Sequence, residues 1–312
     1  MADVVTLGET MALWRTDDAG APTNGSRGTL GFGGTDSNVA IALARLGHSS
    51  KWISVLGDDE LGRMIASGIE SEGVEISVRF SKSLPTALMV KSPSKSKERF
   101  VSFYRSGSAA SRMGVADVSE DDFEGAKIFH FSGITPMLSP SCAELMHKAV
   151  DVCKSNGALI SFDVNHRSAL WDGLAAKETY LEFCGEADLV FGDREELSLI
   201  VGQDLTDEDL MGRVAEHGPT HVVMKLGEEG AMSLSGGELL ARPAVKVEIV
   251  DTVGAGDAFV AGYLSALLDD EPPADRLFRA TYCGAQACTS PGDWEGAVTR
   301  DQLNVARGEL VS

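Results

Sequence analysis

The residues from Asp251 to Phe259, Asp-Thr-Val-Gly-Ala-Gly-Asp-Ala-Phe, combine a glycine-rich turn with a carboxylate. The β-branched alternation of Val245 to Val250 predicts a strand before the turn, and the apolar residues after Asp257 predict a buried helix. Glycines allow a close backbone approach, and the N–H groups and dipole of a helix N-terminus favour an anion. Asp257 would then remove a proton from a hydroxyl beside a stabilised phosphoryl group, which predicts a small-molecule kinase.

A glycine-rich strand-to-helix turn is also a common tight connection, but this run is more specific than Gly-x-Gly alone. It has neither the Walker spacing nor the Gly-x-Gly-x-x-Gly dinucleotide pattern. It resembles the C-terminal signature of the ribokinase-like (PfkB) carbohydrate kinases, which include ribokinase, fructokinase and 2-keto-3-deoxygluconate kinase. The resemblance implies that Asp257 is the catalytic base and that the backbone at Gly254, Ala255 and Gly256 steadies the transferring group.

A second run, from Gly33 to Gly47, begins with a glycine pair and carries an apolar helical stripe. A structural role explains the stripe, but not the glycine pair followed by the polar Asn38. The run resembles the N-terminal signature of the same family. The resemblance implies that Gly33, Gly34 and Asn38 contact the sugar.

An aromatic–arginine pair, Tyr104-Arg105, ends a strand-like run and offers a hydrogen-bonding ring and a planar fork for a carboxylate. A sugar acid would need the fork, whereas a neutral sugar would not; the alternative is that Arg105 is a surface cation. The segment resembles that of 2-keto-3-deoxygluconate kinases, where the Tyr and the Arg bind the substrate.

The segment Asp163-x-Asn165-x-Arg167 follows an apolar run, and alternate residues of an extended chain point the same way. Asp163 could instead simply cap a turn. The spacing resembles that of sugar-acid kinases, in which this segment lies beside the phosphates and the substrate. A charged Arg167 would offset the repulsion between ATP and a carboxylate substrate.

Four further elements are assigned by the resemblance. Glu195 matches the acid of an Asn-x-x-Glu element that organises Mg²⁺ through water, although Gly192 stands where Asn is expected. Asp293 is a candidate substrate contact in a loop near the C-terminus. The expected nucleotide contacts are Asn165, Lys225, Gly227, Gly230 and Thr252. ATP and Mg²⁺ are the implied cofactors, with K⁺ as an optional one.

Composition limits the classes of partner. The 312 residues carry a net charge of −20, which disfavours nucleic acid and anionic membranes. The sequence shows no signal peptide and no membrane-spanning run, so we expect a cytoplasmic enzyme. The five cysteines lack a Cys-x-x-Cys pair, which argues against a disulfide framework or a zinc site. The acidity suggests a halophilic source, with an ordinary acidic mesophilic enzyme as the alternative.

The predicted fold is α/β: a mostly parallel central sheet flanked by helices, with a small β-sheet lid. Strand-like runs alternate with helical ones across residues 1–312, which indicates a single domain. Residues 11–34 and 76–107 break this rhythm, and the second contains two strand-like runs around a turn at Ser92 to Glu98. In the family such a lid closes on the sugar, and pairing through it would cover its open face, so we expect a homodimer or larger homo-oligomer.

The resulting hypothesis is ATP-dependent phosphorylation of the primary hydroxyl of a sugar acid, 2-keto-3-deoxygluconate or a close relative. A neutral-sugar kinase of the fructokinase or ribokinase type is the enzymatic alternative. A non-catalytic sugar-binding sensor of the same fold is the alternative from another class; the intact Asp257 and glycine turn count against it.

The net charge generates a testable expectation about salt. Added salt shortens the Debye length from about 30 Å at 0.01 M to about 3 Å at 1 M, which screens repulsion across the acidic surface. Molar KCl should therefore raise the melting temperature and preserve activity, as measured by thermal melts with parallel kinetics. Greatest stability in dilute buffer, with inhibition by molar KCl, would show that the acidity is incidental.

Overall fold

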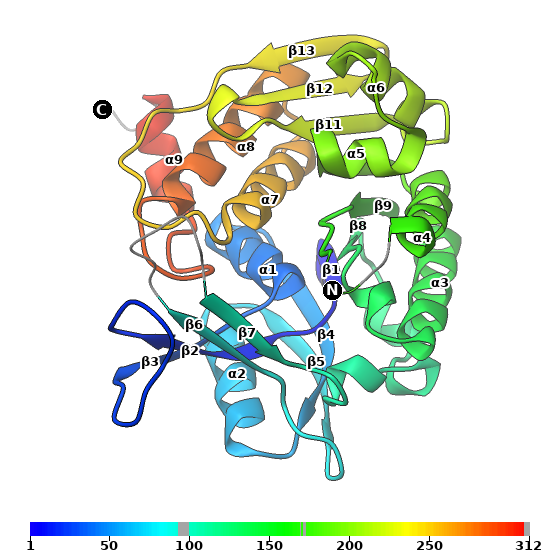
Figure 1. Cartoon of the computed structure of the whole chain (residues 1–312). Coiled ribbons are helices and arrows are strands. Elements are labelled where there is room, and N and C mark those ends of the chain that lie inside the picture. Colours follow the sequence, from blue (N-terminus) through cyan, green and yellow to red (C-terminus); the bar gives the residue numbers. More distant parts are fainter. Residues whose placement is uncertain (93–99, 169, 171–172, 309–312) are drawn as a thin grey trace.

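The computed structural model describes residues 1–92, 100–168, 170 and 173–308, and these form two sheets (Figure 1). The large sheet has nine strands: those from β11 through β5 run parallel, and β12 pairs antiparallel with both β11 and β13. In spatial order they are β13 (Glu238–Arg242), β12 (Ala231–Ser235), β11 (His221–Lys225), β10 (Leu189–Asp193), β9 (Leu159–Asp163), β8 (Ile128–Ser132), β1 (Val4–Leu7), β4 (Ser50–Gly57) and β5 (Glu75–Ser81).

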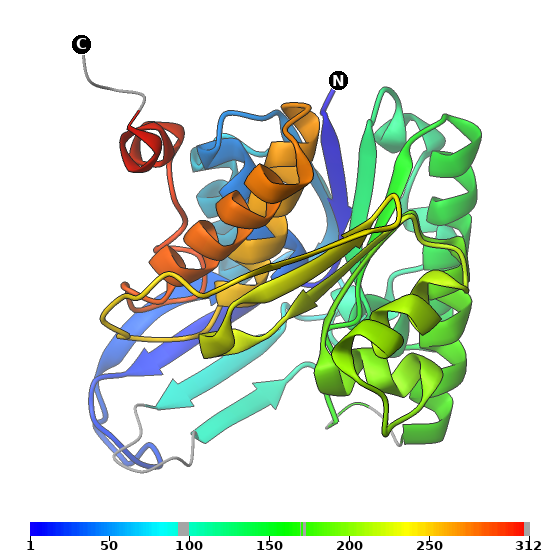
Figure 2. The ribbon, with the colours of Figure 1, turned by 90° about the horizontal axis from the view of Figure 1, so that it is seen from above.

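Helices cover both faces of the large sheet, so its central strands β1 and β8 are buried along their whole length. Figure 2 shows the helices on the two sides. One side carries α3 (Pro140–Ser155), α4 (Gly173–Glu186), α5 (Arg194–Val201) and α6 (Asp207–Ala215). The other carries α1 (Thr35–Arg45), α2 (Glu60–Ser71), α7 (Ala255–Leu268) and α8 (Pro273–Ala287), and α9 (Arg300–Arg307) packs beside α8.

The small sheet forms the predicted lid, in the order β3-β2-β6-β7. Its strands are β3 (Gly28–Gly33), β2 (Met11–Thr16), β6 (Leu88–Ser92) and β7 (Phe100–Tyr104). The predicted start of the second lid segment at residue 76 is too early, because β5 pairs with β4 and extends the large sheet. The predicted turn after Ser92 lies outside the described residues.

The alternation of strands and helices confirms the predicted fold class, but one predicted strand is absent. Residues 245–250 are not in a strand, and Ile249 and Val250 are 64% and 58% exposed. The N–H groups of Val250 and Asp251 instead bond the carbonyl of Cys288 at the end of α8. β-Branched alternation favours extended backbone, but a strand also needs a partner strand, and this segment has none.

The outer face of the lid exposes Leu30 (49%) and Tyr104 (65%). Pairing of two copies through this face stays a prediction. Among the described residues, no helix has the length and apolar character needed to cross a membrane.

Candidate active site

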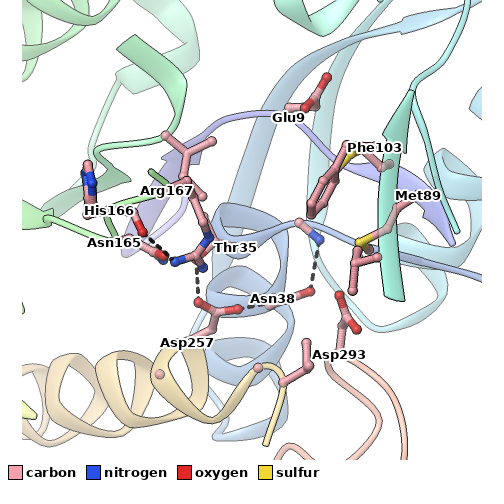
Figure 3. A pocket seen from close by; sticks show the side chains of 18 of the residues that line it. Glu9, Thr35, Asn38, Met89, Phe103, Asn165, His166, Arg167, Asp257 and Asp293 are labelled. Carbon is pink, nitrogen blue, oxygen red and sulfur yellow. Dashed lines mark hydrogen bonds between the residues drawn. The ribbon is translucent and has the colours of Figure 1, made fainter. Parts of the chain in front are cut away.

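A cavity of about 950 Å³ lies between the lid and the carboxyl ends of the large sheet's parallel strands (Figure 3). Ligands of open α/β sheets bind at this edge. The lid contributes apolar side chains such as Met89 and Phe103, and the sheet loops contribute Asn165 and Arg167. The N-terminus of α7 supplies Asp257 at the floor of the cavity. One end of the cavity is therefore bounded by the lid, and the other by the loops that follow β9, β10 and β11.

The turn before α7 has the geometry of an anion-binding loop. Gly254 is the N-cap of α7 with φ 73°, a left-handed conformation that glycine adopts without strain. A Cβ at Gly254 would overlap the carbonyl oxygen of Asp293, so only glycine fits there. A Cβ at Gly256 would meet only Lys225 Nζ, at 3.9 Å, which leaves room above the first turn. The free N–H groups of this first turn can therefore face an anion.

Both carboxylate oxygens of Asp257 accept hydrogen bonds from the first turn of α1. The hydroxyl of Thr35 donates to Oδ1, and Asn38 Nδ2 donates to Oδ2 at 2.7 Å. Asp257 is 8% exposed, and this burial raises the pKa of its carboxyl above the usual value, while the two hydrogen bonds and the charges of Arg167 and Lys225 oppose the rise. The arrangement holds a largely buried carboxylate in one orientation at the floor of the cavity.

A buried charge cluster closes the other end of the cavity. Lys225 Nζ donates to both oxygens of Asp163, at 2.8 and 3.0 Å, and lies 3.7 Å from Glu196 Oε2. Burial disfavours the charge on Lys225, but the two carboxylates outweigh it and raise the pKa of the ammonium. Glu196 also accepts from the backbone N–H groups of His166 and Asp193, both at 2.9 Å. Lys225 is thus a fixed cation near the N-terminus of α7.

The inner face of the lid follows from strand alternation. Val101, Phe103 and Arg105 line the cavity. Met89, the β6 partner of Phe103, lines it too, and Figure 3 shows these two side chains on the lid. Tyr104 lies between Phe103 and Arg105 and therefore faces the opposite side. Because Tyr104 is 65% exposed and does not line the cavity, the structure does not bring this predicted substrate contact to the site.

Arg105 lines the cavity and forms an ion pair with Glu9, which the sequence did not predict. Its Nη2 lies 2.5 Å from Glu9 Oε2, and Ser108 Oγ donates to Glu9 Oε1 at 2.8 Å. The Glu9 side chain is 1% exposed and that of Arg105 is 12% exposed. A buried carboxylate therefore offsets much of the positive charge that Arg105 brings to the lid.

Asp293 lines the same end and is 7% exposed. Burial raises the pKa of its carboxyl to about 7. Its Oδ1 has no hydrogen-bond partner among the described residues. A Cβ on Gly33 would collide with this carboxylate, which explains the glycine at that position.

Most of the predicted site residues meet in this cavity. Those that line it are Gly33, Gly34, Asn38, Arg105, Asn165, Arg167, Lys225, Gly227, Thr252, Gly254, Gly256, Asp257 and Asp293. Ala255 opens α7 but is not among the lining residues. Gly230 is also absent from them; a Cβ there would overlap the carbonyl of Arg242, so this glycine permits close backbone packing.

The acid predicted at Glu195 lies outside the cavity, and its neighbour Glu196 lies inside it. Glu195 is exposed and does not line the cavity, whereas Glu196 lines it and bonds the backbone on two sides. Counting three residues back from Glu196 places Asp193, rather than Gly192, at the Asn position of the Asn-x-x-Glu element. Asp193 also caps α5, accepting from Glu196 N at 2.8 Å.

Sequence reasoning missed Glu9, Thr35, Phe103 and Glu196. Strand alternation could have identified Phe103, because it shares a face with Arg105. The choice between two adjacent glutamates needed the exact start of α5. Nothing in the local sequence marks the pairing of Glu9 with Arg105, which are 96 positions apart, or of Thr35 with Asp257.

Comparison with known proteins agrees with this geometry. The model of the pfkB family carbohydrate kinases matches residues 1–300. The 2-dehydro-3-deoxygluconokinase of Bacillus subtilis is 36% identical over 305 residues, which cover 96% of this chain and 94% of the relative. Fructokinase-1 of Oryza sativa subsp. japonica is 34% identical over 269 residues, 83% of each chain.

Solved structures show the same fold. An E. coli protein described as a ribokinase II, solved in complex with ATP and Mg²⁺, superposes with a TM-score of 0.91 at 24% identity, covering 99% of this chain and 100% of that one. The matched family model spans both glycine signatures and the lid, and the cavity joins them at Asp257. This chain belongs to the pfkB family of carbohydrate kinases.

Proposed function

We propose that this chain transfers the terminal phosphoryl group of ATP to the primary hydroxyl of a sugar acid, 2-keto-3-deoxygluconate or a close relative. The observation that carries the proposal is the presence of two guanidinium groups, Arg105 and Arg167, in one cavity with the buried Asp257. A planar guanidinium binds a carboxylate through two parallel hydrogen bonds. The identity with the B. subtilis 2-dehydro-3-deoxygluconokinase over almost the whole chain supports the same substrate class.

In this mechanism Asp257 accepts the proton of the sugar hydroxyl as the hydroxyl oxygen attacks the phosphorus. The raised pKa that burial gives Asp257 makes it a stronger base than an exposed aspartate. The first-turn N–H groups of α7 stabilise the phosphoryl oxygens, and Lys225 adds a fixed positive charge beside them. Catalysis then rests on positioning and electrostatic stabilisation, as is usual for phosphoryl transfer.

The nucleotide end of the cavity suits a cation held mostly by phosphates and water. Within the described part of the chain, no three His, Cys, Asp or Glu side chains gather as a metal site. Mg²⁺ is commonly held by one or two carboxylates together with substrate phosphates, and Glu196 and Asp193 are the carboxylates placed to do this. When bound with ATP, the ion would neutralise charge on the phosphates.

The ion pair between Arg105 and Glu9 favours a second candidate, a neutral-sugar kinase. Glu9 occupies one side of the guanidinium and would repel a substrate carboxylate, whereas sugar hydroxyls could bond both groups. The identity with the rice fructokinase is in keeping with this reading. Arg167 distinguishes the two candidates: it donates to the carbonyl of His166, and among the described residues it forms no ion pair like the one that joins Arg105 to Glu9.

Replacing the base should abolish turnover without preventing nucleotide binding. Asp257→Asn keeps the shape of the side chain but cannot accept the hydroxyl proton, so kcat should fall by about 10²–10⁴-fold. A coupled ADP-release assay measures turnover, and calorimetric titration with ATP checks binding. Activity within a few-fold of the parent would remove Asp257 from the role of base.

The two adjacent glutamates form a matched pair of variants. Glu196→Gln loses a buried charge beside Lys225, so kcat should fall at least tenfold, and the Mg²⁺ concentration for half-maximal rate should rise. Glu195→Gln changes an exposed side chain, so both quantities should stay within about twofold of the parent. Titrating activity with Mg²⁺ for the three proteins makes the comparison. The opposite ranking would restore Glu195 as the functional acid.

The substrate class is tested with a panel of 2-keto-sugar acids, fructose and ribose. Arg167→Ala, and Arg105→Lys, which keeps a charge opposite Glu9 but loses the fork, should each lower kcat/KM for a sugar acid tenfold or more. ATP affinity should change little. Arg213→Ala, on the exposed surface of α6, is the control. Efficient phosphorylation of fructose or ribose by the parent, with no turnover of sugar acids, would establish the neutral-sugar candidate instead.

A further inference from the structure

The hydroxyl of Thr35 lies between the side chains of Asp257 and Asn165. It donates to Asp257 Oδ1 and accepts a hydrogen bond from Asn165 Nδ2 at 2.8 Å. A threonine hydroxyl has a single proton, and an amide N–H can only donate. With Asn165 donating to the hydroxyl, its proton must point at Asp257, so the direction of this chain of hydrogen bonds is fixed.

The three residues come from three separate parts of the fold. Thr35 opens α1, Asn165 follows β9, and Asp257 lies in the first turn of α7. Asn165 adopts φ 40°, a left-handed conformation that asparagine tolerates better than most residues, and it is buried. The hydroxyl therefore joins the start of two helices to the loop that carries Arg167.

Thr35 and Asn38 are three residues apart, so both face Asp257 from one side of α1. Each supplies one donor to one carboxylate oxygen, and each oxygen keeps a second lone-pair site for the substrate's proton. A carboxylate held by two donors cannot rotate to pair with the nearby cations. We propose that Thr35 is a positioning residue: its hydroxyl orients the Asp257 carboxylate and stabilises its ionised form for proton abstraction.

This proposal rests on the proposed phosphoryl transfer with Asp257 as base, but it does not depend on which sugar is the substrate. Other groups also face Asp257. Arg167 and Lys225 favour its ionised form, while Asp36 on α1, Asp163 on β9 and Asp293 repel it. None of these charges is altered when only the Thr35 hydroxyl is removed, so a shift in the titration of Asp257 would report the lost hydrogen bond.

The test compares Thr35→Val, which keeps the shape without the hydroxyl, with Thr35→Ser, which keeps the hydroxyl. A hydrogen bond to a charged group is worth roughly a tenfold to hundredfold change in rate, so Thr35→Val should lower kcat by about that factor. KM for both substrates should stay within about threefold. Because Asp257 acts in its ionised form, weaker stabilisation should move the acidic limb of the kcat–pH profile to higher pH. Thr35→Ser should restore the parent profile.

A third variant and an NMR titration make the test independent of a folding defect and of turnover. Thr35→Ala is prepared alongside, so that a folding defect of one hydroxyl-free variant, seen in its thermal melt, does not end the comparison. The Asp257 carboxyl is also titrated by ¹³C NMR, with Asp257→Asn used to assign its signal, and its pKa should rise in Thr35→Val and Thr35→Ala. This readout needs no turnover, so it separates a failure of this proposal from a failure of the proposed function.

An unchanged Asp257 titration in the hydroxyl-free variants would overturn the proposal. So would a loss of activity in Thr35→Ser equal to that in Thr35→Val, since it would point to the methyl group and packing. If the enzyme phosphorylates only neutral sugars but the pH profile and the Asp257 titration shift as expected, Thr35 is a positioning residue. The proposal of a sugar-acid substrate is then wrong.

Discussion

The site depends on stabilising one buried carboxylate, that of Asp257, at the floor of the cavity. An isolated buried charge is strongly disfavoured, and it becomes tolerable only with hydrogen-bond donors and opposite charges around it. Asp257 obtains its two donors from the first turn of α1, more than 200 positions away in the chain. The start of α1 must therefore face the start of α7, and the strand order that places β1 inside the large sheet brings the two helices together.

The distribution of charge reconciles an acidic protein with anionic substrates. The chain carries a net charge of −20, yet Lys91, Arg105, Arg167 and Lys225 all line the cavity. Three of these cations are paired with carboxylates at or beside the cavity: Lys225 with Asp163, Arg105 with Glu9, and Lys91 with Asp251 at 2.5 Å. Burial raises the pKa of Asp36 to about 8, so this carboxyl is mostly neutral at neutral pH. The local field in the cavity is thus set by contacts of a few ångströms, not by the surface.

Structural features that depend on local sequence pattern were predicted correctly. Features that depend on contacts between distant segments were not. The buried helix predicted after Asp257 is α7, because its apolar residues from Ala258 to Ala266 pack inside the protein. Tyr104 offers a hydrogen-bonding ring beside Arg105, but alternation along β7 places Phe103, and not Tyr104, at the cavity. Residues 245–250 have strand-forming side chains but no neighbouring strand. The resemblance pointed to Glu195, but the structure puts Glu196 in the cavity, and the sequence pattern alone does not fix the start of α5 to one residue.

The close approach of Gly254 to the carbonyl of Asp293 joins the two loops that the proposed function assigns to different ligands. One loop presents N–H groups to an anion, and the other presents a carboxyl group at the lid end of the cavity. Because not even a methyl group fits between them, a displacement of one loop would also displace the other. Changing the length of the loop around Asp293, as in a transplant from a relative that recognises another sugar, would also displace the start of α7. Substrate range in this chain is therefore easier to alter from the lid than from its C-terminal loop.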